Sequence, residues 1–487
     1  MPPASRHGRR HAPRNARPSE VDALEEKPDD KAAHAARGPL EKVLSIFADT
    51  HPGEGVSAVL LTASVFLLLT SYYLLKTARE PLILESGAEI KSYSSAGQAL
   101  LLIPATYLYG RLAQRVGRIK LITVVTLIFA SNLFIFFALH LAGVPIGIAF
   151  FLWVGVFNMM IVAQFWSFAA DVYTEAQGKR LFAILGIGST VGAVAGSALA
   201  SRLVRPIGVY GLMLTAVGFL LASLTLTIVV HRREKRASER RAAAEHDAKD
   251  PKKAADSTDA PLGKKGGFAL LLGDRYLLLI AALAFLLNCV NTNGEYILDR
   301  TLLQHVKDIL PAGADAHAFK EEYVGEFKAH YFLYVNSATV ILQLFVVSRI
   351  IKYLGVRVAL FIAPVISLAG YSALVLYPVL GIIFAVKISE NTLDYSVQNT
   401  SRQALWLITS RDEKYKAKSV IDAFITRCGD FLSAGITLVG VALGFATVHF
   451  IMINVALAGA WLTVVALLAR QHKKREATVA PSAEPAA

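Results

Sequence analysis

Five charged or polar residues recur at helical spacing inside a long apolar stretch between residues 379 and 408. They are separated by four, three, four and four residues, in the order Lys387, Asn391, Asp394, Gln398 and Arg402. On an α-helix these steps place the five side chains on one face. A charge at the centre of a bilayer costs at least about 2.5–3.5 kcal/mol. We therefore expect this face to line a water-filled cavity between helices, which predicts a membrane transporter.

Other charged residues lie in or near the ends of further apolar segments. The first segment ends with Lys76 and Arg79, the fourth with Asp171, the seventh contains Glu295, and the eleventh begins near Lys418. Arginine binds phosphate or carboxylate oxygens in pairs, so cations in a cavity would suit a multiply charged anion. The alternative is that each charge reaches out of its helix end to the membrane surface.

The elements that would carry these residues are membrane-spanning helices. The chain has 487 residues, is 54% hydrophobic and has a mean hydropathy of +0.47. Its apolar residues form blocks of about 20, which is the length needed to cross a bilayer. We predict an all-α polytopic fold with twelve transmembrane helices in two pseudo-symmetric six-helix halves. The predicted helices span residues 55–78, 94–114, 118–141, 145–171, 181–203, 208–231, 272–298, 327–350, 356–377, 379–408, 419–443 and 447–469.

The predicted organisation has five parts. A disordered cytoplasmic tail (1–50) precedes the N-terminal half (51–231), a basic cytoplasmic linker (232–270), the C-terminal half (271–470) and a short cytoplasmic tail (471–487). The net charge of +13 comes mainly from the loops and tails. Cationic loops stay on the cytoplasmic side of a membrane, which predicts both termini in the cytoplasm and a location in the inner membrane. The same rule explains the basic charge without a nucleic-acid partner.

The two halves repeat at a constant offset. Arg111 and Gly117 recur 238 residues later as Arg349 and Gly355, and Glu175 recurs at the same offset as Glu413. One offset shared by several loops indicates duplication of a six-helix unit. Two such halves around a cavity are typical of major-facilitator-like transporters.

Other patterns favour structure over catalysis. The fifth predicted helix carries Gly186, Gly188, Gly192 and Gly196, and glycines at steps of four favour close helix packing rather than a phosphate loop. The two cysteines lie far apart in apolar segments, and no Ser/His/Asp set or metal-ligand cluster occurs. We expect no enzyme activity, no cofactor and no metal site. Aromatic residues such as Tyr72 and Tyr73 could stack on a purine, although packing is the simpler interpretation.

Three stretches resemble the ATP/ADP translocases, the nucleotide transporters of intracellular bacteria and plastids. They are Leu75–Leu82 (LKTAREPL), Phe165–Gly188 and Lys414–Asp430, within a resemblance that covers most of residues 50–445. The resemblance implies exchange of nucleotides, governed by a basic residue in helix 1, acids in helices 4 and 7, and a lysine near helix 11. By motif these positions fall on Arg79, Asp171, Glu295 and Lys418. The chain has Arg79-Glu80 where translocases have Lys-Asp, and Asp171 where a Glu is usual, so the charge signs are kept.

Three functional hypotheses follow. The first is alternating-access exchange of nucleotides or a related phosphorylated anion, with Arg79, Lys387, Arg402 and Lys418 holding phosphates. In that hypothesis Asp171, Glu295 and Asp394 tune affinity and gating, and Lys76 and Gln398 complete the substrate-binding set. The second is a proton-coupled porter for another organic anion. The third is a transporter-like membrane protein that recruits unknown protein partners through its tail and linker.

Overall fold

The structure is a computed structural model, and it describes residue 51 and residues 54–113, 115–173, 175–245, 266–410 and 412–479. The predicted N-terminal tail, Gln114, residues 246–265 of the predicted linker and residues 480–487 of the predicted C-terminal tail lie outside these residues. Within the described ranges all regular secondary structure is helical, and no strand occurs. The expectation of an all-α fold is confirmed.

The N-terminal half begins at α3 and ends within the long helix α8. Its elements are α3 (Gly55–Glu85), α4 (Ala88–Ala113), α5 (Arg118–Leu141), α6 (Gly147–Phe157), the π-helical turn η1 (Asn158–Val162), α7 (Ala163–Val172) and α8 (Glu175–Glu245). Gly208 has a φ of 68°, a left-handed conformation that divides α8 into two arms. The two arms correspond to the fifth and sixth predicted helices.

The C-terminal half repeats this plan with more interruptions. Its elements are α9 (Gly267–Gly273), α10 (Arg275–Asp308), α11 (Ala316–Phe345), α12 (Val347–Leu376), α13 (Leu380–Leu393), η2 (Asp394–Gln398), α14 (Asn399–Leu405), η3 (Glu413–Ala417), α15 (Lys418–Val420), η4 (Ile421–Ile425), α16 (Thr426–Ala442) and α17 (Thr447–Val479). The short helix α9, which was not predicted, lies directly before α10.

Each predicted segment falls on a helical stretch, although not every one is apolar along its whole length. By length and composition, eight described stretches could cross a membrane, and the one from Arg180 to Arg236 contains both arms of α8. The predicted segments outside these eight lie in α4, α11 and α13–α14. These are the helices that carry Lys91, Lys328 and Lys387, which are buried in the protein. The chain is therefore a multi-pass membrane protein that encloses charged groups.

Glycines allow the first arm of α8 to lie directly against α3. A Cβ on Gly192 would lie 2.4 Å from the carbonyl oxygen of Phe66, and one on Gly196 would lie 2.7 Å from that of Thr70. Gly188 packs against Thr62 in the same way. The predicted packing role is confirmed for these three glycines but not for Gly186, whose Cβ would meet nothing within 4 Å.

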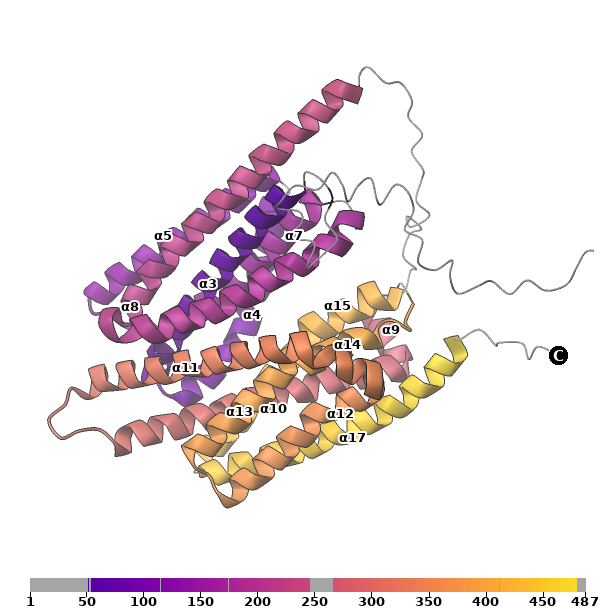
Figure 1. The fold of residues 1–487 in the computed structure, drawn as a ribbon. Helices are drawn as coiled ribbons and strands as arrows, with labels where there is room; N and C mark the ends of the chain where they lie inside the picture. Colours follow the sequence, from indigo (N-terminus) through magenta and orange to yellow (C-terminus); the bar gives the residue numbers. More distant parts are fainter. Residues whose placement is uncertain are drawn as a thin grey trace, which may run out of the picture.

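The two halves lie side by side, with α11 running along the N-terminal half and the ribbons diverging toward the end that carries the C-terminus (Figure 1). We call that end the linker end, and the opposite end, with the α3–α4 and α10–α11 connections, the hairpin end. At the hairpin end Arg205 of α8 pairs with Glu326 of α11 at 2.7 Å, and His317 contacts Glu85 at 2.7 Å. Contacts between the halves are thus concentrated toward the hairpin end.

A π-helical turn interrupts the fourth and tenth helical segments at matching places. η1 begins at Asn158 and η2 begins at Asp394, a step of 236 residues, which is close to the 238-residue offset of the sequence repeat. π-Helical turns often occur at functional sites. The extra residue also changes the phase of the helix, so side chains before and after η2 no longer share one face.

Candidate functional site

A cavity of about 750 Å³, part of it open solvent, lies between the two halves. Its walls come from α3, α4 and α6 on one side and from α10, α11, α13, η2 and α16 on the other. The lining residues are Lys76, Arg79, Glu80, Lys91, Ser95, Gln98, Phe151, Asn291, Thr292, Glu295, Phe332, Asn391, Tyr395, Arg427 and Asp430. Charged side chains and aromatic rings therefore line the same cavity.

Two cations on α3 face this cavity in different electrostatic settings. Lys76 Nζ lies 4.4 Å from the centre of the Phe332 ring, and no ion pair of Lys76 occurs within the described residues. Arg79 lies one helical turn further along α3, where its guanidinium covers the Phe151 ring at 4.5 Å and donates to Glu80. Lys76 is held by aromatic faces, which attract a cation without neutralising it.

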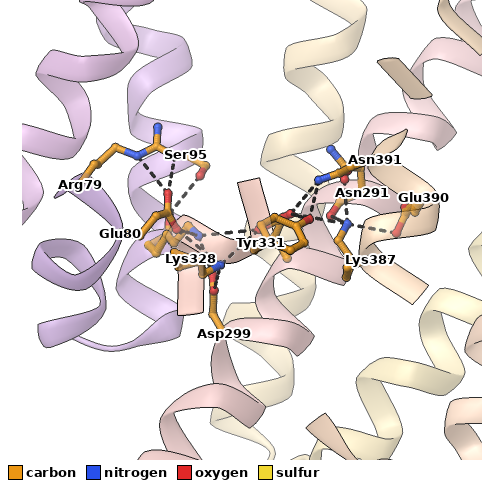
Figure 2. Close-up of polar contacts among 12 residues, drawn as sticks. Arg79, Glu80, Ser95, Asn291, Asp299, Lys328, Tyr331, Lys387, Glu390 and Asn391 are labelled. Carbon is orange, nitrogen blue, oxygen red and sulfur yellow. Dashed lines mark hydrogen bonds and ion pairs between the residues drawn. The ribbon is translucent and has the colours of Figure 1, made fainter. Parts of the chain in front are cut away.

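A buried cluster of four charged residues joins the halves at the wall of the cavity, and Figure 2 labels three of them, Glu80, Asp299 and Lys328. Lys91 of α4 lies 2.5 Å from Glu80 of α3 and 2.6 Å from Asp299 of α10. Lys328 of α11 lies 2.5 Å from Asp299 and 3.6 Å from Glu80. Glu80 and Lys91 come from one half and Asp299 and Lys328 from the other. Because none of the four is more than 9% exposed, separating the halves here would break pairs shielded from water.

Glu295 links this cluster to a second one inside the C-terminal half. Its carboxylate lies 3.6 Å from Lys328 and 3.7 Å from Lys387, and it accepts a hydrogen bond from Tyr331 at 3.0 Å. Lys387, which is fully buried, pairs with Glu390 at 3.0 Å, while Asn391 donates to Tyr331 at 2.6 Å. Glu295 is 25% exposed and lines the cavity, so it connects the buried pairs to the solvent-accessible space.

The charges of the two clusters balance when Arg79, which pairs with Glu80, is counted with them. Four cations (Arg79, Lys91, Lys328 and Lys387) face four carboxylates (Glu80, Asp299, Glu295 and Glu390). Arg427, at the cavity wall, pairs with Asp430 at 3.3 Å. Among the residues of these clusters and the cavity lining, Lys76 provides the one positive charge left over. The cavity consequently attracts anions, but more weakly than its number of cations suggests.

The predicted site residues do not all come together. Lys76, Arg79 and Glu295 line the cavity, as does Asn391. Asp171 lies at the linker end, where it pairs with Arg118 at 2.7 Å. Lys418 is also at that end and donates to Gln403 at 2.7 Å. Neither Asp171 nor Lys418 belongs to the cavity lining in this conformation.

The expectation that the whole stripe on the tenth segment lines a water-filled cavity is wrong. Only Asn391 of the five does so; Lys387 and Gln398 are fully buried in protein. Both amide atoms of Gln398 and one carboxylate oxygen of Asp394 are buried without a hydrogen-bond partner among the described residues. Arg402 is half-buried on α14. The π-turn η2 rotates the later residues away from the face that Asn391 shares with the cavity.

Lys91 and Lys328 were missed by the sequence reasoning because of errors in helix boundaries. Residue 327 was predicted to begin a helix, which would place Lys328 at a membrane surface, but α11 begins at Ala316. Likewise α4 begins at Ala88 rather than at residue 94. Both lysines are therefore inside a helix, and because both are buried, each needs a carboxylate partner. The signal in the sequence was the presence of Glu80 and Asp299 in other helical segments, because these acids could pair with buried lysines.

Comparison with known proteins agrees with this architecture. Residues 57–392 match the family model described as Major Facilitator Superfamily. Solved structures with the same fold include the POT family transporter PepTSo (TM-score 0.58, 13% identity, covering 86% of this chain and 98% of that chain). Another is the nucleoside transporter NupG (TM-score 0.55, 12% identity, 86% and 99%). A third is a bacterial homologue of the iron transporter ferroportin in an inward-facing state (TM-score 0.57, 10% identity, 85% and 98%).

No curated protein sequence matches the chain. At these low identities the structural likenesses show the fold alone, whereas the family model covers well over half of the sequence. The chain is a multi-pass transporter that belongs to the Major Facilitator Superfamily.

Proposed function

We propose that this transporter moves an organic anion, with a nucleotide or related phosphorylated anion as the first candidate, by alternating access between its halves. The observation that carries the proposal is Lys76, a cation that lines the central cavity and has no carboxylate partner among the described residues. An uncompensated charge in a low-dielectric setting is costly, and a bound anion would offset that cost.

Arg79 supplies a second anchor one turn away. Its guanidinium is shared between the cavity and Glu80, so a phosphate or carboxylate could take over some of its hydrogen-bonding capacity. The rings of Phe151, Phe332 and Tyr395 also line the cavity and offer flat apolar faces. Cations beside aromatic faces would suit a phosphate joined to a base. The sequence resemblance to ATP/ADP translocases supports the same class.

Alternating access would use the buried cluster as the contact that closes the hairpin end. The pairs Lys91–Asp299 and Lys328–Glu80 must separate before a substrate can leave the cavity in that direction. An anion that competes with Glu80 for Arg79 would weaken the cluster from the cavity side. This link would make opening depend on bound substrate, which is the requirement for exchange.

A second candidate is a proton-coupled porter for a simpler organic anion. Two observations favour it: the cavity has only one surplus positive charge, and Glu295 lies part-exposed near Lys91, Lys328 and Lys387. A proton on Glu295 would release cationic groups to a substrate. In this scheme the proton on Glu295, rather than a counter-substrate, would couple the inward and outward movements of the carrier.

The experiment that tests these candidates is uptake into proteoliposomes containing the purified protein. Labelled ATP, ADP, nucleoside monophosphates and small carboxylates would each be offered with and without internal unlabelled substrate, and with and without a pH gradient. Nucleotide uptake that requires internal nucleotide supports exchange. Uptake of an anion driven by the pH gradient alone supports the porter.

Lys76→Met is the test variant, and Lys120→Met, which removes an exposed cation at the linker end, is the matched control. We expect the first to lose uptake and the second to keep it. Transport of neutral or cationic solutes only, or full anion uptake by Lys76→Met, would overturn the proposal. A chain that acts by recruiting partners would transport nothing, and would lose its function on deletion of residues 1–45, which lie outside the described residues.

A further inference from the structure

A basic pocket lies at the linker end, away from the central cavity. It comprises about 740 Å³ of space, part of it open solvent, between the start of α10 and the last turns of α17. Its lining residues are Arg275, Leu467, Arg470, Gln471, Lys473 and Lys474, and no acidic residue is among them. Four cationic side chains therefore border one pocket that the transport cycle proposed above does not use.

The pocket follows from the spacing of residues along α17. Leu467, Arg470 and Lys474 are separated by three and four residues, so they form a stripe along one face of the helix, with Lys473 beside it. Arg275, the first residue of α10, faces the same pocket. Arg470 and Lys473 are three residues apart, and like charges at this spacing repel one another, so a bound anion between them would be favourable.

Contacts on another side of α17 hold the two helices in this arrangement. Arg475 pairs with Asp274 at 2.5 Å and with Glu413 at 2.8 Å, and its guanidinium covers the Tyr276 ring. The Tyr276 hydroxyl lies 2.9 Å from Nδ1 of His472. Asp274 and Glu413 are thus paired with Arg475. Arg275, Arg470 and Lys473 are exposed and form no ion pair within the described residues.

Exposed apolar side chains lie just before Arg275. Phe268 and Leu272 of α9 are 51% and 70% exposed, and Leu467 provides an apolar wall within the pocket. A short apolar helix at the end of a membrane-spanning helix is suited to the boundary between headgroups and acyl chains. At the membrane boundary, cationic side chains would contact an anionic lipid headgroup, and the apolar surface would contact its acyl chains.

We propose that this pocket binds the headgroup of an anionic phospholipid, with the phosphate between Arg275, Arg470 and Lys473 and an acyl chain along Leu467 and α9. Basic pockets beside membrane helices are suited to such headgroups. The exposed Leu272, three residues before Arg275, and the apolar wall at Leu467 favour a lipid over free phosphate, because inorganic phosphate would leave both side chains in contact with water. The proposal does not depend on which substrate the central cavity carries.

The test measures lipid binding by the full chain purified in detergent. Phosphatidylglycerol and phosphatidylcholine are titrated separately, and the thermal stability of the protein is recorded at each concentration in about 150 mM salt. A ligand that binds the folded state raises its apparent stability. We expect stabilisation by phosphatidylglycerol and retention of that lipid in native mass spectrometry. Phosphatidylcholine and inorganic phosphate are expected to have no effect.

The test variant is Arg275→Gln combined with Arg470→Gln and Lys473→Gln. The matched control changes three exposed arginines of α8, Arg232→Gln, Arg233→Gln and Arg236→Gln, at the same end of the molecule. Each basic residue near an anionic surface contributes about fivefold to binding, so the test variant should bind phosphatidylglycerol on the order of 100-fold more weakly. Lys473→Gln alone, which changes one exposed residue, should weaken binding about fivefold.

Three results would overturn the proposal. One is equal loss of binding in the test variant and the α8 control, which would indicate general surface charge rather than a site. Another is equal stabilisation by phosphatidylcholine. The third is stabilisation by inorganic phosphate that phosphatidylglycerol does not exceed, which would indicate a site for a soluble anion.

Discussion

Lys91 of α4 and Asp299 of α10 form a 2.6 Å ion pair across the two halves, although 208 residues separate them in the sequence. Lys91 also contacts Glu80, and Asp299 also contacts Lys328. Removing one member of a buried pair leaves an uncompensated charge, which typically costs about 3–5 kcal/mol. Asp299 does not line the cavity, so substituting it can separate the structural role of the pair from substrate binding.

Asp299→Asn should favour conformations in which the hairpin end is open. Ser92 of α4 lies 3.1 Å from Thr437 of α16 across the halves, so a cysteine at position 92, in a background without Cys289 and Cys428, reports separation there. We expect its labelling by a water-soluble maleimide to accelerate at least tenfold in Asp299→Asn. Ser64→Cys, buried between α3 and α8 of one half, is the control and should label slowly in both backgrounds. Equal rates at position 92 would contradict the closing role.

Lys76→Met should abolish anion-induced thermal stabilisation while leaving the unliganded protein as stable as the wild type, or slightly more stable. The reason is that Lys76 contacts aromatic rings and forms no ion pair among the described residues. Arg79→Ala should also lose substrate binding, but it should destabilise the empty protein because Glu80 loses a partner. Thermal unfolding of both variants, with and without substrate, checks this difference. Equal destabilisation by the two substitutions would be inconsistent with an unpaired Lys76.

Gly192→Ala should destabilise the N-terminal half by roughly 1–3 kcal/mol, because the new Cβ meets the Phe66 carbonyl oxygen and forces α8 away from α3. Gly186→Ala, on the same arm of α8, meets nothing within 4 Å and should stabilise it by about 0.5–1 kcal/mol. Denaturation of the two variants in one detergent gives the comparison. The prediction fails if both substitutions shift stability in the same direction.

Glu54, at the start of α3, predicts a pH effect at the linker end. Burial alone would raise the pKa of its carboxyl, but hydrogen bonds from Arg180, the His51 backbone and Gln177 outweigh burial and lower that pKa below 4.5. A lowered folded-state pKa contributes stability above the unfolded value, and that contribution is lost as the pH falls through the folded value. Wild type should therefore be more stable than Glu54→Gln at neutral pH, with the difference shrinking below pH 4.5. A difference that does not change between neutral pH and pH 3 would contradict this account.

The sequence was sufficient for the helical segments and for close packing along the glycines of α8, although it did not identify α3 as the packing partner. The length of an apolar segment and the spacing of its glycines are local properties of the sequence. The structure has the expected close packing at Gly188, Gly192 and Gly196. The division into twelve segments is reflected in helical stretches, although the five proposed parts and the membrane orientation stay predictions. The family model shows membership of the Major Facilitator Superfamily, which is a broader group than the ATP/ADP translocases that the sequence resembles. The nucleotide substrate stays a proposal.

The candidate site was harder to predict because it depends on helix phase and on partners distant in sequence. The π-turn η2 separates Asn391 from Gln398 although their spacing suits one face of an α-helix. Lys91 and Lys328 become recognisable as cluster residues only when Asp299 and Glu80 are placed beside them. Regular periodicity carries no information about an inserted residue or about pairing across halves.

The balanced charges around the cavity have a consequence for how membrane voltage acts on transport. With the eight clustered charges cancelled and Arg427 paired to Asp430, the empty cavity carries a single surplus positive charge on Lys76. Moving one elementary charge through the whole field contributes about 2.3 kcal/mol per 100 mV. A carrier loaded with a monoanion would cross the field nearly neutral, so voltage would act on its empty return. With a polyanion bound, the loaded carrier has a net negative charge, so voltage would act on the loaded step as well as on the empty return.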